Sequence, residues 1–454
     1  MKTQNNTKNL TLFALTWPIF IEILLHMLMG NADTLMLSMY SDNSVAAVGV
    51  SNQILSVIIV MFGFIATGTS VLVAQHLGAK QEKEAAEITV ISIAANLLFS
   101  VALSVIVFVL SIKLLKIMDL PNELFGEANS YLQMVGGFIF LQAIIMTLGA
   151  TLKSYGFTKD IMYVTIGMNI INVIGNYLFI FGPFGIPVLG VEGVAISTNV
   201  SRVLGLIVTV LLLFKRIEHE LPFKRLFALP MSHLKNLLKI GIPSAGENLS
   251  YNTSQMLMTY FITIMGTEAL TTKVYTQNIM MFILLFSFAI SQGTQIMIGR
   301  MIGARNFNDA YNRCLKSLYM GAAISTLMAI TFSIFSDQLL SIFTSNPDIL
   351  RTGGTLILLT IILEPGRAIN MVIINALRAA GDVKLPVYLG IASMWGVAVP
   401  VSYFLGLHLE MGLIGIWIAF IVDEWLRGVI MYWRWRSKRW QNKSLITVYK
   451  EQTA

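Results

Sequence analysis

The sequence predicts an all-α integral membrane protein of twelve transmembrane helices, arranged as two repeat-related lobes of six. Three observations support this fold class: a shortage of charge, a series of apolar segments and an internal repeat. Only 12% of the 454 residues are charged and 56% are hydrophobic, whereas a soluble protein is roughly a quarter charged. Lipid must therefore cover much of the surface, and each segment of ~20 apolar residues is long enough to cross it once.

Twelve apolar runs, separated by polar breaks, predict the individual helices. In chain order the runs cover residues 11–38, 46–74, 88–115, 129–153, 161–182, 189–214, 237–265, 270–299, 314–336, 350–377, 386–407 and 411–433. Pro18 and Pro243 lie within about two turns of the starts of the first and seventh runs, where proline is tolerated or produces a kink.

An internal repeat relates the first six runs to the last six. A shift of 225 residues places Pro18 on Pro243 and Glu22 on Glu247, and it places residues 73–80 on residues 298–305 without a gap. The same shift matches Lys153 with Arg378, Gly156 with Gly381 and Lys159 with Lys384. Near the end of the repeat, Gly190 and Gly193 match Gly412 and Gly415, which is three residues out of step. One shift that holds over so many positions indicates a duplication.

The duplication predicts four regions. They are an N-terminal six-helix lobe at 1–215, a cytoplasmic linker at 216–234, a C-terminal six-helix lobe at 235–440 and a cytoplasmic tail at 441–454. Because each half has an even number of spans, both halves enter the membrane in the same orientation. Parallel repeats of this kind place the substrate path at their interface and favour alternating access by rocking of the halves. A duplicated channel is the structural alternative.

Basic residues predict the orientation. If the N-terminus is cytoplasmic, 24 of the 31 Lys and Arg residues fall on the cytoplasmic side, and the outside loops hold only four: Lys113, Lys116, Lys273 and Arg351. This bias predicts a multi-pass protein of the cell membrane with both termini in the cytoplasm. It also assigns the net charge of +7 to topology and lipid headgroups, so we expect no nucleic-acid partner.

Several functional classes are unsupported by the sequence. The single Cys314 excludes an intramolecular disulfide and a multi-cysteine metal site, and the five histidines have no metal-ligand spacing. There is no HExxH, Walker lysine loop or GxSxG motif, so neither an enzyme nor direct use of ATP is expected. We expect no cofactor beyond a coupling ion, either H⁺ or Na⁺.

Three motifs resemble those of the multidrug and toxic compound extrusion (MATE) family. The first is GNADTLMLS at 30–38, late in the first helix. The second is AQHLGAK at 74–80, with its repeat GRMIGAR at 299–305. The third is LRAAGD at 377–382, with the weaker repeat LKSYG at 152–156. The resemblance covers nearly the whole chain and implies a twelve-helix, two-lobe exporter that exchanges Na⁺ or H⁺ for organic, often cationic, substrates.

Asp33 and an asparagine stripe are the main candidates for cation coupling. A charged side chain inside a span costs several kcal/mol (~2.5–3.5 on insertion scales), so it marks a functional site unless it lies close to interfacial water. Asn169, Asn172 and Asn176 share one face of the fifth helix, where they either bind a ligand or bond neighbouring helices. The resemblance implies a site of Asp33, Asn172, Asn176 and Thr198, with Asp33 as a possible Na⁺ ligand. Some relatives have a second acid where Asn176 stands, so a two-carboxylate relay is in doubt.

Two repeat-related pairs are candidates for the substrate cavity. Glu22 and Glu247 each follow their proline by four residues. They act either as cavity acids or as structural acceptors for a neighbouring helix. Gln53 and Asn278 are the second pair, in the second and eighth helices.

The tenth helix adds Glu364, Arg367 and Asn370 to the cavity candidates, which also include Asn169 of the fifth helix. Glu364 and Arg367 are spaced to form an ion pair. Arg367 stands where other branches of the family have an acid that helps to bind Na⁺, and a fixed positive charge there would repel a cation. Cation coupling is therefore expected in the N-terminal lobe. Asp423 and Arg427, four residues apart, predict a structural ion pair.

The leading hypothesis is a secondary active antiporter that exports organic, cationic or amphipathic compounds. A lipid-linked precursor flippase and, from another class, a membrane-embedded enzyme are the alternatives. The expected partners are a small-molecule substrate and membrane lipid, and the protein is expected to be a monomer.

Overall fold

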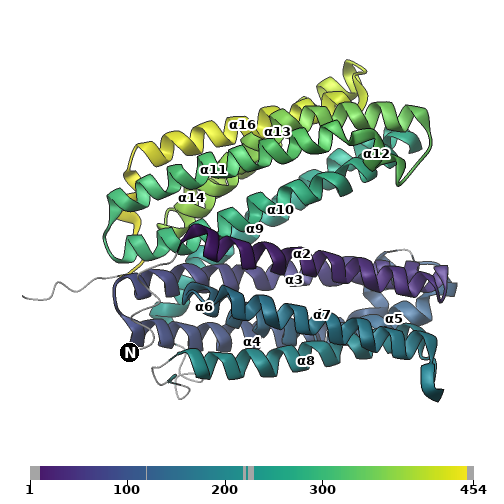
Figure 1. Cartoon of the computed structure of the whole chain (residues 1–454), viewed down its shortest axis with the longest axis horizontal. Helices are drawn as coiled ribbons and strands as arrows, with labels where there is room; N and C mark the ends of the chain where they lie inside the picture. The colour runs from purple at the N-terminus through teal and green to yellow at the C-terminus, as the bar shows by residue number, and fades with distance from the viewer. Residues whose placement is uncertain (1–10, 119, 218–220, 223–229, 447–454) are drawn as a thin grey trace, which may run out of the picture. The chain divides into compact units, whose positions relative to one another are not determined.

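The computed structural model describes residues 11–118, 120–217, 221–222 and 230–446, and all regular secondary structure in this part of the chain is helical (Figure 1). The predicted linker and tail lie partly outside the described residues. The chain divides by its contacts into two compact units, residues 1–241 and 242–454, which are called the N-lobe and the C-lobe below.

Seven α-helices lie in the described part of the N-lobe before α9 (Met231–Ile264), and two of them form one bent span. They are α2 (Leu12–Ser38), α3 (Asp42–Gly78), α4 (Glu82–Ile117), α5 (Asn122–Gly137), α6 (Phe140–Ser154), α7 (Thr158–Phe181) and α8 (Gly190–Arg216). Helices α5 and α6 meet at an angle of 42°. The bend follows Gly136 and Gly137, which weaken the helix at this point.

The C-lobe repeats this order with its breaks in other places. Its elements are α9 (Met231–Ile264, shared with the N-lobe at its start), α10 (Thr267–Gly303), α11 (Phe307–Ile334), α12 (Ser336–Ser341), α13 (Pro347–Ala379), α14 (Lys384–Ser393), α15 (Val399–Tyr403), α16 (Gly412–Arg436) and the short helix η5 (Arg439–Lys443). Two π-helical stretches, 394–398 and 404–408, make α14 and α15 one continuous span that ends at His408.

Nine helices in the described ranges are long and apolar enough to cross a membrane, and the bent α5–α6 pair makes ten. Helices α9 and α16 are as long as the others, and they complete six spans in each lobe. They are less apolar because polar side chains interrupt them; α16 carries Asp423, Glu424 and Arg427 in its middle turns. Each predicted span corresponds to one of these twelve segments, with helix ends within about seven residues of the predicted ones.

Helix ends preserve the duplication in their backbone geometry. Lys80 after α3 and Arg305 after α10 are related by the 225-residue shift, and both have positive φ, at 59° and 57°. In each lobe the next residue closes the helix with the same hydrogen bond, from Gln81 N to His76 O and from Asn306 N to Met301 O, both 2.9 Å. This bond and the left-handed residue define a Schellman cap.

A second pair of caps follows α6 and α13. Gly156 and Gly381 have φ of 95° and 86°, a region that strongly favours glycine. Their following residues, Phe157 and Asp382, donate to the carbonyls of Leu152 and Leu377 over 2.9 Å. The two lobes therefore end equivalent helices in the same way.

The three-residue slip late in the repeat has a local cause. The 225-residue shift would end the counterpart of α7 at residue 406, but that span continues to His408 because its π-helical turns take up extra residues. The connection that follows then occupies only residues 409–411, whereas the N-lobe uses 182–189. A helix two residues longer and a connection five residues shorter together produce the slip.

The end of the chain that the structure describes packs onto the C-lobe. Trp440 of η5 is fully buried and stacks on Trp435 of α16, with ring centroids 4.1 Å apart. Arg434 of α16 forms an ion pair with Asp382 over 2.7 Å. A Cβ added at Gly381 would collide with the carbonyl oxygen of Lys443, so the glycine provides the close approach as well as the cap.

Candidate functional site

The N-lobe brings together the four residues predicted for cation coupling. Asp33 of α2 is buried at 9% exposure, and its Oδ1 accepts a hydrogen bond from Asn176 Nδ2 of α7 over 2.6 Å. Asn176 Nδ2 also lies 3.4 Å from Asn172 Oδ1. Asn172 Nδ2 in turn donates to Thr198 Oγ1 of α8 over 3.3 Å. The four side chains therefore form one polar chain across three helices.

Local packing explains why α7 and α8 align these groups. Asn172 and Asn176 are one helical turn apart and both are fully buried. Between them, Gly175 faces Ser197 so closely that an added Cβ would lie 2.5 Å from Ser197 Oγ. The glycine thus lets α7 approach α8 at the level where Asn172 meets Thr198.

The site also includes residues that were not predicted for it, namely Asn52, Tyr131 and Arg202. Tyr131 of α5 is buried and donates to Asn52 Oδ1 over 3.3 Å, and it interacts with both Thr198 and Asp33. Arg202 of α8 is buried and is electrostatically coupled to Asp33, although no ion pair within 4.0 Å joins them in the described ranges. Arg202 lies one turn after Thr198 on α8, a spacing that is visible in the sequence; Tyr131 has no such signal.

Asn169, the third member of the asparagine stripe, has a different environment. It is half-buried, and its Nδ2 donates to the carbonyl of Leu25 on α2 over 3.3 Å. The stripe therefore has two functions in the structure. Asn169 joins α7 to α2, whereas Asn176 bonds Asp33 directly and Asn172 contacts Asn176.

Glu22 and Glu247 form equivalent ion pairs in the two lobes. Glu22 of α2 accepts from Lys153 Nζ of α6 over 2.9 Å, and Glu247 of α9 accepts from Arg378 Nη2 of α13 over 2.6 Å. Acid and base are both related by the 225-residue shift. Each pair joins the first span of its lobe to the fourth, which supports the structural interpretation for Glu22, whereas Glu247 both forms its ion pair and lines the cavity described below.

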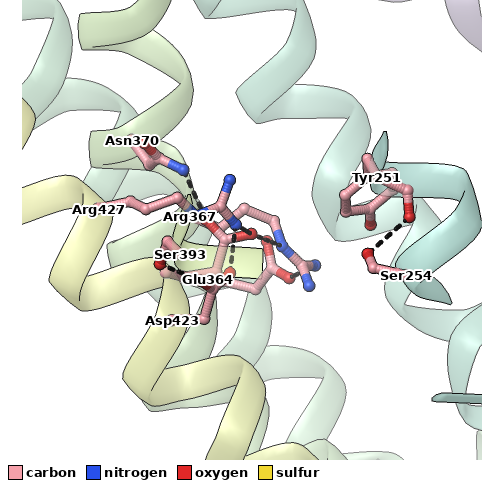
Figure 2. A network of polar contacts seen from close by, with 9 residues as sticks. Tyr251, Ser254, Glu364, Arg367, Asn370, Ser393, Asp423 and Arg427 are labelled. Carbon is pink, nitrogen blue, oxygen red and sulfur yellow. Dashed lines mark hydrogen bonds and ion pairs between the residues drawn. The ribbon is translucent and has the colours of Figure 1, made fainter. Parts of the chain in front are cut away.

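The C-lobe contains a network of three acids and two arginines (Figure 2). Arg367 Nη1 donates to Glu364 Oε1 over 2.6 Å, and Arg427 Nη2 donates to Asp423 Oδ2 over 2.6 Å. Both predicted ion pairs are thereby confirmed. Glu424 connects them, because its carboxylate lies 3.6 Å from Arg367 Nε and 3.0 Å from Arg427 Nη2.

Neutral side chains complete the network. Asn370 Nδ2 donates to Glu424 Oε2 over 2.8 Å, and the Ser393 hydroxyl donates to Asp423 Oδ1. Figure 2 shows these groups converging from α13, α14 and α16. Such mutual pairing is what a membrane interior requires of charged residues.

A cavity of about 280 Å³ lies beside this network, within the C-lobe. Its charged lining residues are Glu247, Lys273, Arg367, Arg378, Glu424 and Arg427. Its apolar lining includes Met280, Met281, Leu284, Phe288, Met371, Met394, Trp417 and Phe420.

The remaining cavity candidates lie in various places. Asn370 lines the cavity, whereas Glu364 is fully buried behind Arg367. Gln277 lines the cavity next to the predicted Asn278, which is exposed. In the N-lobe, Gln53 is likewise exposed. Adjacent residues of a helix point about 100° apart, so the rotation of α10 about its axis decides which of Gln277 and Asn278 faces the cavity.

The Asp33 site combines one acid with neutral polar groups. No group of three or more His, Cys, Asp or Glu side chains suited to a metal occurs in the part of the chain that the structure describes. At Asp33, one carboxylate is accompanied by amide and hydroxyl groups, which offer oxygen atoms to a cation and hydrogen-bond donors to a carboxylate.

Comparisons with known proteins identify the family. A family model described as MatE matches residues 18–178 and 243–404, one match in each repeat. "Uncharacterized transporter YisQ" of Bacillus subtilis is 60% identical over 438 residues, which are 96% of either chain. A "Probable multidrug resistance protein NorM" of Thermotoga maritima is 27% identical over 96% of this chain and 94% of its own.

Solved structures show the same fold. A mutant of the Vibrio cholerae MATE transporter VcmN matches with a TM-score of 0.87 and 20% identity, over 97% of this chain and 99% of its own. An outward-facing multidrug resistance MATE transporter of the MOP superfamily matches with a TM-score of 0.85 and 19% identity, over 94% and 95%. The predicted membrane fold of twelve helices in two repeat-related lobes is therefore confirmed, and this chain belongs to the MatE family of membrane transporters.

Proposed function

We propose that this protein is a secondary active antiporter that exports amphipathic organic compounds in exchange for protons. The observation that carries the proposal is Asp33, a buried carboxylate that has no ion-pair partner within 4.0 Å among the described residues. It contacts Asn176 instead. A carboxylate that is not tied to a fixed cation can gain and lose a charge during a transport cycle.

Asn176 is suited to both charge states of Asp33. Its Nδ2 donates to the carboxylate over 2.6 Å, and its own Oδ1 has no hydrogen-bond partner. If Asp33 takes up a proton, rotation of the Asn176 amide by half a turn brings Oδ1 into position to accept from the new O–H. The same pair of side chains therefore satisfies an ionised and a protonated Asp33.

Na⁺ is the alternative coupling ion. Asp33, Asn172, Asn176 and Thr198 offer four oxygen-bearing side chains, which a hard cation accepts as ligands. One feature favours the proton: the Asn176 amide nitrogen lies 2.6 Å from Asp33 Oδ1 and 3.4 Å from Asn172 Oδ1, so an N–H donor stands where a metal ion would need an oxygen ligand.

The C-lobe cavity and the relatives support export of small molecules. The relative from Thermotoga maritima is named as a probable multidrug resistance protein. A cavity of about 280 Å³ with methionine and aromatic walls approaches the size range of drug-binding pockets, and methionine adapts to varied shapes. That volume is small for the sugar–lipid precursors of a flippase.

The basic residues support a cytoplasmic position for both termini, in the cell membrane. The ratio of 24 to 4 comes from the sequence alone, and the relatives are bacterial transporters. An alkaline phosphatase fused after residue 446 should be inactive in Escherichia coli, whereas a green fluorescent protein at that point should be bright.

The proposed coupling is tested in everted membrane vesicles that bear wild-type protein, Asp33→Asn or Asp42→Asn. Asp42 is exposed at the first residue of α3, so it is a matched control. We expect a pH gradient to drive dye transport by wild type and Asp42→Asn but not by Asp33→Asn, with a Na⁺ gradient ineffective. Transport by Asp33→Asn at the wild-type rate would refute the role of Asp33, and transport driven by Na⁺ alone would replace the proton with Na⁺.

A further inference from the structure

The charged side chains that line the C-lobe cavity differ in whether they have an ion-pair partner. Four cationic side chains and two carboxylates line it. The three arginines each bond a carboxylate: Arg378 bonds Glu247, Arg367 bonds Glu364, and Arg427 bonds Asp423. Both acids of the lining, Glu247 and Glu424, lie within ion-pair distance of arginines.

Lys273 is the exception among these cations. It belongs to α10, about 9 Å along the helix from Thr267 at 1.5 Å per residue, and lies within the predicted run 270–299. Its Nζ donates to Thr259 Oγ1 of α9 over 2.6 Å. No carboxylate lies within ion-pair distance of it in the described ranges, although its side chain is partly buried and faces the cavity.

A lysine in this position is costly without a function. An ammonium group within a span is disfavoured unless it pairs or faces water, and the neighbouring hydroxyl satisfies only one of its three N–H donors. Two donors thus remain for a group that enters the cavity. A carboxylate, sulfonate or phosphate would supply both the acceptor oxygens and a negative charge within reach of Lys273, where the described residues place none.

We propose that the C-lobe cavity binds organic anions, with Lys273 as the charge partner of the anionic group. The apolar body of such a molecule packs against Met280, Met281 and Phe288 of the same helix and against Trp417 and Phe420 of α16. The inference deepens the proposed function and rests on it, because it names the substrate class of the exporter.

The charges of the cavity disfavour an organic cation. A cationic group would have to displace Arg378 from Glu247, its one carboxylate partner among the described residues, or Arg367 and Arg427 from Glu424. It would also be repelled by Lys273. Specificity follows from this repulsion as much as from the attraction of an anion.

Three probes with one fluorophore test the proposal by equilibrium binding to the purified protein in detergent. Dansylglycine carries a carboxylate, its methyl ester is neutral, and dansylcadaverine carries an ammonium group. We expect wild type to bind dansylglycine about tenfold more tightly than the ester, the size of effect expected for one charge-assisted pair. Dansylcadaverine should bind most weakly.

Variants assign the preference to one side chain. Lys273→Gln should bind dansylglycine and its ester equally, and unchanged binding of the ester shows that the cavity is intact. Lys273→Arg should restore the preference for the anion. Lys116→Gln, an exposed lysine at the end of α4, should leave all three affinities unchanged.

Two results would overturn the proposal. One is a wild-type protein that binds the ester or dansylcadaverine as tightly as dansylglycine, which decides the matter even if Lys273→Gln fails to fold. The other is a Lys273→Gln protein that keeps the preference for the anion. Binding needs no ion gradient, so failure of the proposed coupling, seen with Asp33→Asn in vesicles, is distinguishable from failure here.

Discussion

Removing either partner of the Glu22–Lys153 ion pair should destabilise the N-lobe by about 3 kcal/mol, whereas removing both should cost about 1 kcal/mol. The two side chains are only 12% and 16% exposed, and Lys153 Nζ lies 2.9 Å from Glu22 Oε1. At an effective dielectric constant of 20, that distance corresponds to an attraction of about 6 kcal/mol. Desolvation of both groups offsets much of the attraction, but a single substitution leaves one charge buried without its partner.

The experiment is a double-mutant cycle with Glu22→Gln and Lys153→Met. The free energy of unfolding is measured by titration with SDS and followed through Trp17, the only tryptophan of the N-terminal half. Incorporation of 5-fluorotryptophan gives Trp17 a ¹⁹F resonance of its own, which the Trp17→Phe variant assigns. The Arg216–Asp160 pair is the control, because Arg216 is 38% exposed and exposed pairs contribute ~1 kcal/mol or less.

The cycle discriminates clearly between outcomes. If Glu22→Gln and Lys153→Met have additive effects, the two side chains do not interact and the ion pair is not what holds α2 to α6. If the single variants cost no more than Asp160→Asn, burial does not strengthen the pair. The repeat-related Glu247–Arg378 pair should behave like Glu22–Lys153, since its side chains are 9% and 13% exposed.

Two further predictions concern the helix ends. Gly381→Ala should speed tryptic cleavage after Lys438 and Lys443, because the added Cβ collides with the Lys443 carbonyl oxygen and a φ of 86° is strained for alanine. Gly156→Ala is the control: it introduces similar strain in the N-lobe and should not change cleavage at these two sites. Equal cleavage in the two variants would refute the role of the collision. Lys80→Gly should raise the free energy of unfolding by about 0.5–1 kcal/mol, because glycine adopts the positive φ of 59° without strain. A variant that is less stable in the SDS titration would show that contacts of the lysine side chain contribute more than the strain costs.

The sequence was sufficient to predict the membrane spans and the ion pairs between residues of the same helix. The spans follow from apolar runs, and Glu364–Arg367 and Asp423–Arg427 follow from helical spacing, which places such residues on one face. Asp33 and Asn176 were singled out, and the structure joins them over 2.6 Å.

Rotation of helices about their axes was not predictable. In a membrane, both the lipid-facing and the buried sides of a helix are apolar, so the pattern that orients a helix in a soluble protein is weak. Gln277 therefore lines the cavity where Asn278 was expected. The contribution of Tyr131 to the Asp33 site depends on how α5 packs, for which spacing gives no signal.

The helix caps with positive φ, at Lys80 and Gly156 in the N-lobe and at Arg305 and Gly381 in the C-lobe, mark off equivalent segments of the two lobes. Residues 82–154 and 307–379 lie between equivalent caps and have the same length, although the first segment is broken at 138–139 and the second at 335. Where a helix breaks is thus a local choice made within a conserved length. Each segment has matching ends, so chimaeras joined at the caps should keep both the chain length and the helix ends of the lobe that receives the segment. Helix breaks can therefore differ between the two lobes while the ends of the segment stay the same.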